Sequence, residues 1–431
     1  MQESDKDTNS NAISHVIILG GGFAGLSAAK QLAKAHVRIT LIDKEGHHLF
    51  QPLLYQVATA GLSAADIAEP LRHVFAKQKN LTTLMDEVVG IDLESNEVEL
   101  KHDRLHYDYL IIGLGASTGY FGNNHWAKYA PGLKTLDEAT ELRRRILLAF
   151  ESAEFAKTDE EANRSMNFVV IGGGPTGVEL AGAVAELAHY VLVDEFRRID
   201  TKRTSVHLIE AGPRLVPAFR EKQSSYTLHR LEEMGVEVHL NTKVSEITAD
   251  RVVAGDKSFD VGTVLWAAGV EGNPVARKIK SLELDRAGRV IIDTDLNIPG
   301  HKNVFVAGDL AHLKDHKGIV VPGVAPAAMQ MGKHSAKQIL SDLKKRDRKP
   351  FVYFDKGNMA TIGRVSAIAE TKKLAVHGYL AWLAWLFVHL IFLIGLRNRV
   401  SVFIQWVWSY VGWHRGARVI TKKLPSDESI G

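Results

Sequence analysis

The stretch His15–Gly25, HVIILGGGFAG, decides the fold because a short apolar run leads directly into a glycine-rich turn. A helical pattern follows over Leu26–Leu32. In this order, the backbone N–H groups of the turn and the N-terminus of the helix can face a pyrophosphate. Asp43 ends the next apolar run, Thr40–Ile42, where its carboxylate can accept a hydrogen bond from a ribose hydroxyl. The stretch therefore predicts a dinucleotide-binding unit of strand, helix and strand.

A second copy of this unit lies further along the chain. Phe168–Ile171 (FVVI) leads into Gly172–Gly177 (GGGPTG) and then into a helical pattern. Glu210 follows the apolar run Val206–Ile209, at the place that Asp43 takes in the first copy. A single glycine motif is weak evidence, but two copies with the same flanking elements favour two dinucleotide sites over one site and a decayed structural copy.

Each copy is followed by a buried run that ends in small residues, Tyr109–Ser117 (YLIIGLGAS) and Val264–Val270 (VLWAAGV). A further run, Asn303–Asp309 (NVFVAGD), precedes the long helical pattern Val324–Leu343. Asp309 can bond the ribityl chain or a phosphate of FAD, and the helix N-terminus can stabilise negative charge on a reduced flavin. Two dinucleotide sites on one chain indicate a flavoprotein that takes hydride from a nicotinamide.

The expected fold class is α/β, with two Rossmann-like dinucleotide-binding domains and a C-terminal membrane-anchoring helical segment. The FAD domain is discontinuous and the NAD domain is inserted into it. The charged insertion His189–Lys202 is expected to be helical. The expected boundaries are a disordered tail at 1–13, a first FAD-domain segment at 14–115, the NADH domain at 116–295, a second FAD-domain segment at 296–345 and the membrane-association region at 346–431.

Composition excludes several classes of protein. The 431 residues are 45% hydrophobic and 24% charged, with a net charge of +3 that gives no support to a nucleic-acid binder. Cysteine is absent, which excludes disulfides, cysteine nucleophiles, cysteine-ligated iron–sulfur clusters and CxxC redox pairs. The histidines show no pattern that justifies a metal claim, so no metal site is expected. The polar N-terminus does not resemble a secretory signal, and the folded part is expected to stay in the cytoplasm.

The C-terminal region has a different composition from the rest of the chain. No acid occurs from Thr371 to Ser426, whereas eight basic residues do. Gly378–Leu396 carries no formal charge over 19 residues, a length that is borderline for a membrane-spanning helix. The tryptophans of the region are expected to contact the membrane; they are Trp382, Trp385, Trp406, Trp408 and Trp413.

The segment after Gly378–Leu396 is expected to lie in the membrane interface as an amphipathic helix. Its polar stripe comprises Ser401, Gln405, Ser409 and Gly412, and its aromatic stripe comprises Phe403, Trp406, Tyr410 and Trp413. A single span before it would leave basic residues outside, against the positive-inside tendency. These features favour a monotopic anchor, while a buried core helix or a dimer contact stays open for Trp382–Leu396.

Several motifs together resemble the type II NADH:quinone oxidoreductases, the alternative NADH dehydrogenases. They are GGGFAGL, HHLFQPLLYQVATAGLS, GGGPTGVELAGA, LWAAGV, NVFVAGD and the tail AWLAWLFVHLIFLIGLRNR, which together run from about residue 14 to 420. The resemblance implies non-covalent FAD, NADH as substrate, two-electron reduction of a membrane quinone without proton pumping, and peripheral attachment to the cytoplasmic face of the cell membrane. A homodimer is compatible with it. The alternative is a soluble flavoprotein, either a reductase for a protein electron carrier or a redox sensor.

The resemblance also implies the binding residues. For FAD they are Gly20, Gly22, Phe23, Ala24, Gly25, Asp43, Lys44, Pro52, Val88, Gly308 and Asp309. For NADH they are Gly172, Gly174, Pro175, Thr176, Gly177, Glu179, Glu210, Ala268 and Gly269. Glu179 is expected near the nicotinamide as the catalytic acid; the alternative is an ordinary acid in a first helical turn. Glu210 would repel a 2′-phosphate and so favour NADH over NADPH, although Arg214 is near in sequence.

The quinone site departs from the family pattern. The family carries Ala-Gln-x-Ala-x-Gln after the Gly-Asp motif, whereas this chain has Ala325, Pro326 and Gln330 at the corresponding positions. Proline is tolerated in a first helical turn, so the helix is expected to survive while one amide is lost. Gln330 is expected either to contact the quinone or to pack near the flavin.

Overall fold

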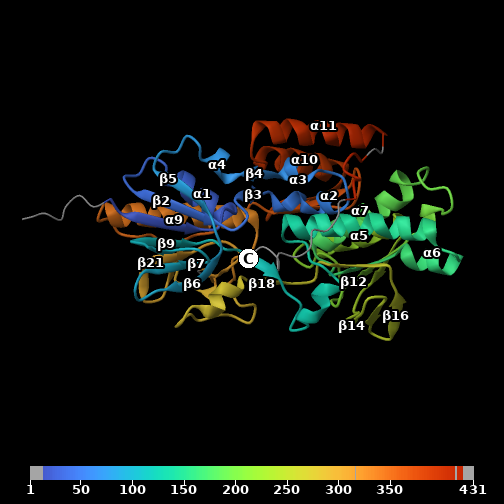
Figure 1. Ribbon diagram of the computed structural model, residues 1–431, viewed down its shortest axis with the longest axis horizontal. Helices are drawn as coiled ribbons and strands as arrows, with labels where there is room; N and C mark the ends of the chain where they lie inside the picture. The colour runs from blue at the N-terminus through green and yellow to red at the C-terminus, as the bar shows by residue number, and fades with distance from the viewer. Residues whose placement is uncertain (1–12, 316, 413–414, 421–431) are drawn as a thin grey trace, which may run out of the picture. The chain divides into compact units, whose positions relative to one another are not determined.

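The computed structural model describes residues 13–315, 317–412 and 415–420. Most of the expected N-terminal tail, and Trp413, lie outside these residues. The chain forms two compact units. Unit 1 comprises a segment ending at His48 together with Glu69–Ser117 and Glu271–Asp355, and unit 2 comprises Leu49–Ala68, Thr118–Val270 and the chain from Lys356 onward. Figure 1 shows the helices and strands of both units.

Unit 1 is built on a six-stranded sheet whose order is β20-β21-β9-β1-β2-β5. The strands are β1 (His15–Leu19), β2 (Arg38–Asp43), β5 (Leu81–Met85), β9 (Tyr109–Ile112), β20 (Asn297–Ile298) and β21 (His301–Val306). All neighbours pair in parallel except β20 with β21. Because β1 is buried along its whole length and almost entirely apolar, it lies inside this sheet, as a continuous hydrophobic run predicts.

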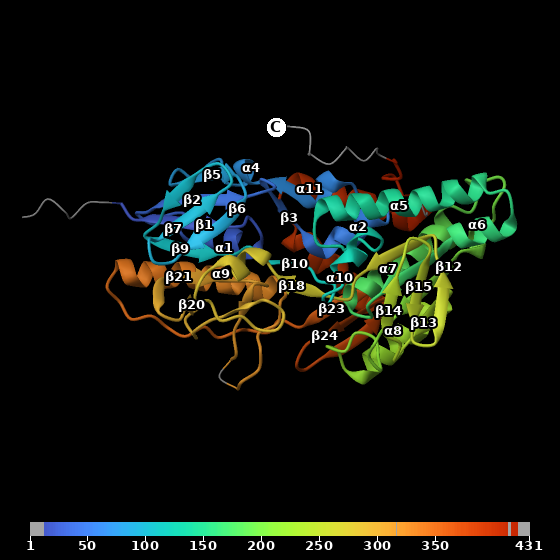
Figure 2. The ribbon, with the colours of Figure 1, turned by 60° about the horizontal axis from the view of Figure 1, so that its bottom comes forward.

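Two helices of unit 1 pack together, α1 (Phe23–Gln31) and α9 (Ala325–Leu343) (Figure 2). Gly332 permits this contact, since a Cβ there would lie 2.0 Å from the Ala24 carbonyl oxygen. The other elements of unit 1 are α4 (Leu71–Val74), β6 (Val88–Asp92), β7 (Glu97–Leu100), β8 (Arg104–His106), β19 (Val290–Ile291) and β22 (Ala311–His312).

Unit 2 contains a four-stranded parallel sheet of order β13-β12-β11-β17. Its strands are β11 (Asn167–Ile171), β12 (Ser205–Ile209), β13 (Val236–His239) and β17 (Thr263–Trp266). An antiparallel sheet of β14 (Val244–Ile247), β15 (Arg251–Ala254) and β16 (Lys257–Asp260) shares a buried core with it. The helices of this region are α5 (Leu136–Phe155), α6 (Asp159–Ser165), α7 (Pro175–Glu186) and α8 (Glu221–Glu233).

The C-terminal region of unit 2 forms an antiparallel sheet and two helices. The strands are β23 (Asn358–Thr361), β24 (Ala367–Glu370) and β25 (Ala375–Gly378), and the helices are α10 (Tyr379–Phe392) and α11 (Leu396–Gly412). The short helices α2 (Leu54–Ala58) and α3 (Ala64–Ile67) also belong to unit 2. The remaining strands are β3 (His47–Leu49), β4 (Ala68–Pro70), β10 (Ala116–Thr118) and β18 (Val270–Gly272). Among the described residues, none of the helices combines the length and the apolar character needed to cross a membrane.

Two features differ from the sequence expectations. The insertion His189–Lys202 is not a helix: a π-helical turn covers Leu187–Val191 and a 3-10 turn covers Thr201–Arg203. The Glu154 carboxylate accepts backbone N–H bonds between them and so fixes a non-helical path. The C-terminal region also packs within unit 2, where the Gln223 side chain donates to the Val376 carbonyl at 3.0 Å.

Candidate active site

The first glycine loop lies between β1 and α1 in unit 1. Gly20 has φ +93° and lies so close to Gly113 that a Cβ would come within 2.4 Å of its carbonyl oxygen. Asp43 holds this loop, because its Oδ2 accepts from the Gly21 N–H at 2.7 Å. At Gly22, in contrast, a Cβ would meet no protein atom within 4 Å. The loop therefore presents an open backbone position beside a helix N-terminus, as a bound pyrophosphate requires.

The second glycine loop repeats this design in unit 2, between β11 and α7. Gly172 has φ +109°, and a Cβ there would lie 2.6 Å from the Cα of Ala268. Glu210 accepts from the N–H groups of Gly173 and Gly212, both at 2.6 Å. A Cβ at Gly174, like one at Gly22, would meet no protein atom within 4 Å. Each acid thus braces its glycine loop, a role that the sequence pattern did not indicate.

The other residues predicted to bind FAD divide between the units. Phe23 and Ala24 begin α1, and Gly308 lies against it, since a Cβ at Gly308 would be 3.5 Å from the Ala24 Cβ. Asp309 follows Gly308 after β21, Lys44 pairs with Glu45 at 3.3 Å, and Val88 is buried at the start of β6. Pro52, however, lies in the 3-10 turn Gln51–Leu53 of unit 2. The structure therefore groups the glycine loop with Gly308 and Asp309 at one edge of the unit 1 sheet.

The residues predicted to bind NADH all lie in unit 2. Pro175 and Thr176 begin α7, and Gly177 packs closely on Gly172, whose carbonyl oxygen would lie 1.8 Å from a Cβ at Gly177. Gly269 follows β17 and would place a Cβ 2.8 Å from the Gly119 carbonyl oxygen. Arg214, near Glu210 in sequence, donates to the Phe219 and Pro217 carbonyl groups at 2.9 and 2.8 Å. Its guanidinium group thus braces the loop after β12.

Glu179 lies in the first turns of α7 and lines a cavity of about 50 Å³ within unit 2. Burial raises the pKa of Glu179 to about 8, and the Thr361 N–H, 3.4 Å from its Oε1, only partly opposes this. Glu179 is therefore largely protonated at neutral pH. The cavity admits water but not a quinone ring. Its polar lining comprises Tyr55, Gln56, Thr59, Glu186, Arg364, Ser409, Tyr410 and Arg415 as well as Glu179 and Thr361.

A chain of buried hydrogen bonds leads from α11 toward Glu179. The Trp406 indole N–H donates to the Gln56 amide oxygen at 2.8 Å, and the Gln56 amide nitrogen donates to the Tyr55 hydroxyl at 2.9 Å. The Tyr55 hydroxyl is bonded to the Thr361 hydroxyl at 3.1 Å. We call this series the α11 relay. It connects Glu179, through the Thr361 backbone, to a helix more than two hundred residues away in sequence.

A buried ion pair closes the other side of the cavity. The Arg415 guanidinium lies 3.1 Å from the Glu186 carboxylate and also donates to the carbonyl groups of Thr59 and Ala183 at 2.8 and 3.2 Å. The Arg364 backbone N–H donates to the other oxygen of Glu186. Burial raises the pKa of Glu186, and the arginine opposes that shift. Arg415 thus ties the segment after α11 to α7.

Comparison with known proteins identifies the family. The chain matches the pyridine nucleotide-disulphide oxidoreductase family over residues 14–332 and the NDH2 C-terminal domain over residues 356–412. It is 45% identical to the type II NADH:quinone oxidoreductase NdhA of Mycobacterium tuberculosis over 95% of this chain and 90% of that protein. The chain belongs to the type II NADH:quinone oxidoreductase family. A second relative in this family, Ndh of the same organism, is 42% identical over 94% and 90% of the two chains.

Solved structures share the fold of this family member. NDH2 from Plasmodium falciparum in complex with NADH matches with a TM-score of 0.86 at 21% identity, covering 95% of this chain and 100% of that one. The sulfide:quinone oxidoreductase of Aquifex aeolicus matches with a TM-score of 0.69 at 19% identity, covering 92% and 95%. Both likenesses show a common α/β architecture.

The family carries two glutamines at the start of the helix that corresponds to α9, and this type II oxidoreductase has one, Gln330. Its side chain bonds to the backbone of a neighbouring segment. Pro326 lies in the first turn of α9, after Ala325, and the helix continues through it. The Gln330 amide donates to the Phe354 carbonyl at 3.0 Å and accepts from the Phe354 N–H at 2.9 Å. Quinone contact by Gln330 stays a prediction, whereas its hold on the segment after α9 is observed.

The expectation that the tryptophans contact the membrane needs correction for three of them. Trp382, Trp385 and Trp406 are 6%, 0% and 5% exposed and pack inside unit 2, whereas Trp408 is 66% exposed. The polar stripe of α11 also points inward, because Ser401 and Gln405 donate to the Asp66 carboxylate, each at 2.8 Å. A stripe pattern fixes the period of a helix but not which stripe meets the protein. The polar Ser401 and Gln405 face inward, whereas the expected aromatic stripe is divided, with Trp406 buried and Phe403 54% exposed.

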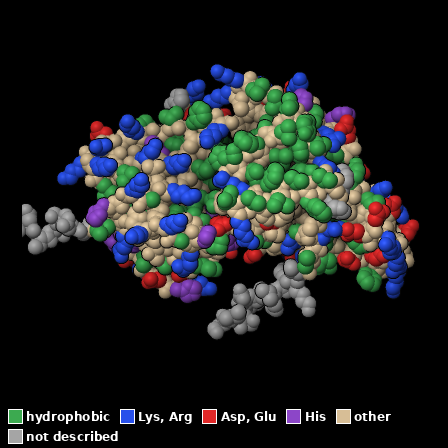
Figure 3. Space-filling model, turned by 90° about the horizontal axis from the view of Figure 1, so that it is seen from above, with side chains coloured by type: hydrophobic (Ala, Val, Ile, Leu, Met, Phe, Trp, Pro, Cys, Tyr) green, Lys and Arg blue, Asp and Glu red, His purple; other side chains and the backbone are tan. Residues whose placement is uncertain are grey.

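The outward side of both helices is apolar (Figure 3). We define the apolar face by its members, which are 41% to 82% exposed: Leu380, Leu383, Phe387 and Ile391 of α10, and Val400, Phe403, Ile404, Val407, Trp408 and Val411 of α11. Arg397 and Arg399, at the start of α11, are exposed beside it. Isolated exposed apolar residues are ordinary, but a contiguous patch with basic neighbours marks an interaction surface.

The sequence interpretation missed Tyr55, Gln56, Thr361, Glu186 and Arg415. Tyr55 and Gln56 lie in the stretch LFQPLLYQVATAGLS, whose specificity to the family was the available signal. No sequence signal pointed to Arg415 and Glu186, because their pairing depends on how α11 returns the chain to α7.

Proposed function

We propose that this protein oxidises NADH and reduces a membrane quinone by two-electron transfer through non-covalently bound FAD, without pumping protons. The observation that carries the proposal is the 45% identity to a type II NADH:quinone oxidoreductase over nearly both full lengths. The complete absence of cysteine agrees with it, since disulfide reductases of this scaffold require a redox cysteine pair. The alternative function, a soluble reductase for a protein electron carrier, does not explain the apolar face.

Unit 1 is the proposed FAD domain. Its glycine loop leaves Gly22 open while Asp43 fixes the turn, and Gly308 and Asp309 follow β21, which is separated from β1 by β9 in the same sheet. These residues fit a dinucleotide whose pyrophosphate meets backbone N–H groups. FAD bound there would supply the hydride acceptor and the two-electron donor of the reaction.

Unit 2 is the proposed NADH domain. Gly174 is the open backbone position of its loop, and Glu210 places a negative charge at the end of β12. A carboxylate there repels a 2′-phosphate, so NADH should be preferred over NADPH. Arg214 does not offset this preference, because its guanidinium group is engaged by loop carbonyl groups.

Glu179 is the proposed proton-holding group. Quinone reduction to quinol consumes two protons, and a carboxyl group with a pKa of about 8 carries a proton at neutral pH. The adjoining cavity has room for water that could resupply this proton from solvent. The α11 relay fixes Thr361, whose N–H faces the Glu179 carboxyl group.

The apolar face is the proposed membrane contact, on the cytoplasmic side of the cell membrane. Buried apolar area and nearby cations both favour attachment to an anionic lipid surface. A lipid-soluble quinone would then reach the enzyme from the same layer. The expected homodimer stays a prediction.

The test is an anaerobic stopped-flow experiment on the full chain in detergent. NADH should bleach the flavin absorbance, and a quinone added next should restore it with one equivalent of quinol formed per flavin. A flavin that NADH does not bleach, or that quinone does not reoxidise, would contradict the proposed function. Comparable kcat/KM for NADPH and NADH would contradict the nucleotide assignment alone.

A further inference from the structure

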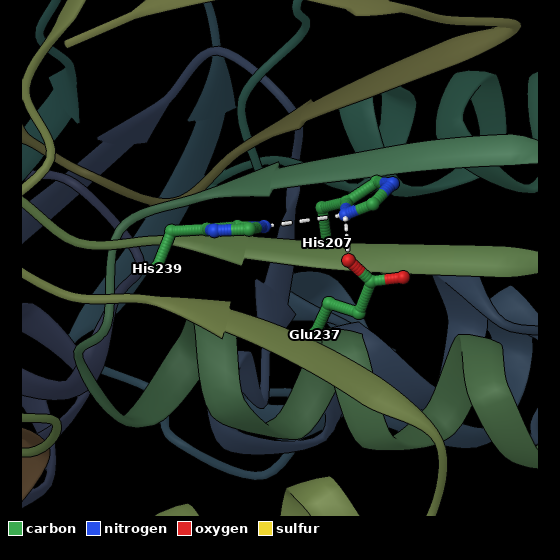
Figure 4. Close-up of side chains that lie close together, drawn as sticks. All are labelled: His207, Glu237 and His239. Carbon is green, nitrogen blue, oxygen red and sulfur yellow. Dashed lines mark hydrogen bonds and ion pairs between the residues drawn. The ribbon is translucent and has the colours of Figure 1, made fainter. Parts of the chain in front are cut away.

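A cluster of two histidines and a glutamate lies on the four-stranded sheet of unit 2. His207 is in β12, and Glu237 and His239 are in β13 (Figure 4). His207 is paired in register with Glu237, and His239 lies two residues further along β13. Because side chains two residues apart in a strand share a face, all three project from the same side of the sheet.

Two of the three distances between ligand atoms are those of a coordination shell, and all three atoms lie within 4.8 Å of one another. His207 Nδ1 lies 3.3 Å from Glu237 Oε2 and 3.3 Å from His239 Nε2. Metal–ligand bonds of about 2.0–2.1 Å in a tetrahedral site place neighbouring ligand atoms about 3.3–3.4 Å apart. A hydrogen-bond explanation is weaker, since one ring nitrogen would serve two partners, both beyond the usual length.

The two imidazole rings are held in place by a third strand. Phe259 of β16 packs against the rings of both histidines, with centroid distances of 5.0 Å to His207 and 5.1 Å to His239. His207 is largely buried, whereas Glu237 is exposed and leaves access from solvent. Ligands on rigid strands beside an apolar ring are the arrangement that keeps a metal site in shape.

We propose that His207, Glu237 and His239 form a binding site for a divalent transition-metal ion of the zinc class. Two imidazole nitrogens and one carboxylate oxygen are a ligand set that suits Zn²⁺, and a fourth position is left for water. Helical spacing could not reveal this site in the sequence, because its two histidines are 32 residues apart on neighbouring strands.

Lys257 is the group that opposes cation binding. Its ammonium lies 3.2 Å from His239 Nδ1, so it must move or lose its proton before His239 can coordinate through Nε2. The side chain is exposed and flexible, and it can swing away at little cost. The site should therefore bind its ion more tightly when this charge is removed.

The site is also connected to Glu210, the acidic residue proposed to face the nucleotide. The Glu210 N–H donates to the His239 carbonyl at 2.9 Å, and Glu210 follows β12 directly. An ion that joins β12 to β13 would restrain this pair of strands. This inference goes beyond the proposed function and does not depend on it.

The experiment is isothermal titration of the metal-stripped full chain with Zn²⁺ alone, with Co²⁺ absorption spectra as a check on geometry. We expect one ion per chain, at least about tenfold weaker binding in His239→Asn and in Glu237→Gln, and tighter binding in Lys257→Gln. The matched control is His229→Asn, which removes an exposed histidine beside Glu233 on α8 and should change nothing.

Two results would overturn the proposal. The first is Zn²⁺ binding that neither His239→Asn nor Glu237→Gln weakens, since the ion would then have other ligands. The second is no binding by the wild-type chain, even if Lys257→Gln bound Zn²⁺, since the lysine would then keep the ion out. Melting curves of the metal-free variants establish that each one is folded.

Discussion

At the residue scale, Glu179 should make stability depend on pH. Its pKa is about 8 in the folded chain, against an ordinary value of 4.5. Between these values the unfolded chain loses the proton first, so the free energy of unfolding falls as pH rises from about 4.5 and the loss is complete above about 8. In Glu179→Gln this slope should disappear.

The measurement is the melting temperature of both proteins between pH 5 and pH 9. The wild type should lose at least about 2 °C relative to Glu179→Gln across this range. Glu232→Gln, which changes an exposed glutamate on α8, is the control and should follow the wild type. Parallel curves for wild type and Glu179→Gln would show that the carboxyl group is not held protonated.

The open glycines should separate the two nucleotide sites. Because a Cβ at Gly22 or Gly174 meets no protein atom, valine there should leave the fold intact and obstruct only the ligand. We expect Gly22→Val to purify without flavin, and Gly174→Val to keep its flavin but to show a KM for NADH raised by at least about tenfold.

Flavin absorbance per chain and steady-state kinetics measure these effects. Gly25→Ala is the contrasting variant, since its Cβ would lie 1.9 Å from the Gly20 carbonyl oxygen and should destabilise the fold itself by at least about 1–3 kcal/mol. Full flavin content in Gly22→Val would mean that FAD does not bind at the first loop.

At the element scale, the α11 relay should matter for both stability and pH dependence. Gln56→Leu leaves the buried Trp406 N–H without its partner, at a cost of about 1–3 kcal/mol, and removes one of the two hydrogen bonds of the Tyr55 hydroxyl. It should also shift the alkaline limb of the pH profile for quinone reduction, because Thr361 loses its support beside Glu179.

Gln51→Leu is the matched control, since that exposed glutamine makes one bond, to the Lys134 carbonyl, in the turn before α2. Thermal melts and pH–rate profiles of both variants are the measurements. An unchanged pH profile in Gln56→Leu would show that the relay contributes to packing alone.

The link between α7 and the segment after α11 includes a buried ion pair. Arg415→Met should cost about 3–5 kcal/mol, because it leaves the Glu186 carboxylate buried without its countercharge. Adding Glu186→Gln should restore much of the loss. Denaturant unfolding of the single and double variants measures this coupling, and a double variant no more stable than Arg415→Met would contradict it.

The elements that the sequence predicted well are those with local signals. Apolar run, glycine turn and helix lie next to one another in each nucleotide unit, so their geometry follows from adjacent residues. The prediction of a helix for the insertion His189–Lys202 was wrong, because the distant carboxylate of Glu154 accepts hydrogen bonds from its backbone and holds it in a non-helical conformation. The α11 relay could not be predicted either, since Gln56 and Trp406 are 350 residues apart.

At the scale of the whole molecule, the C-terminal helices have two roles that one sequence pattern cannot separate. Trp382, Trp385 and Trp406 complete the core of unit 2, while the apolar face points outward. Removing the helices would therefore expose core as well as delete the membrane contact. Charged substitutions on the apolar face test the membrane contact alone.

The most direct test of quinone access through the membrane compares the wild type with Ile404→Glu/Trp408→Glu by stopped flow in lipid vesicles. Both positions are exposed, at 59% and 66%, so the fold should persist. We expect unchanged bleaching of the flavin by NADH and unchanged reduction of ferricyanide, with turnover of a long-tailed quinone reduced at least about tenfold. Phe155→Glu, a charge at a 78% exposed position on α5, should behave as wild type. Full-rate reduction of long-tailed quinone by the double variant would contradict the claim that quinone is reached through a membrane-bound apolar face.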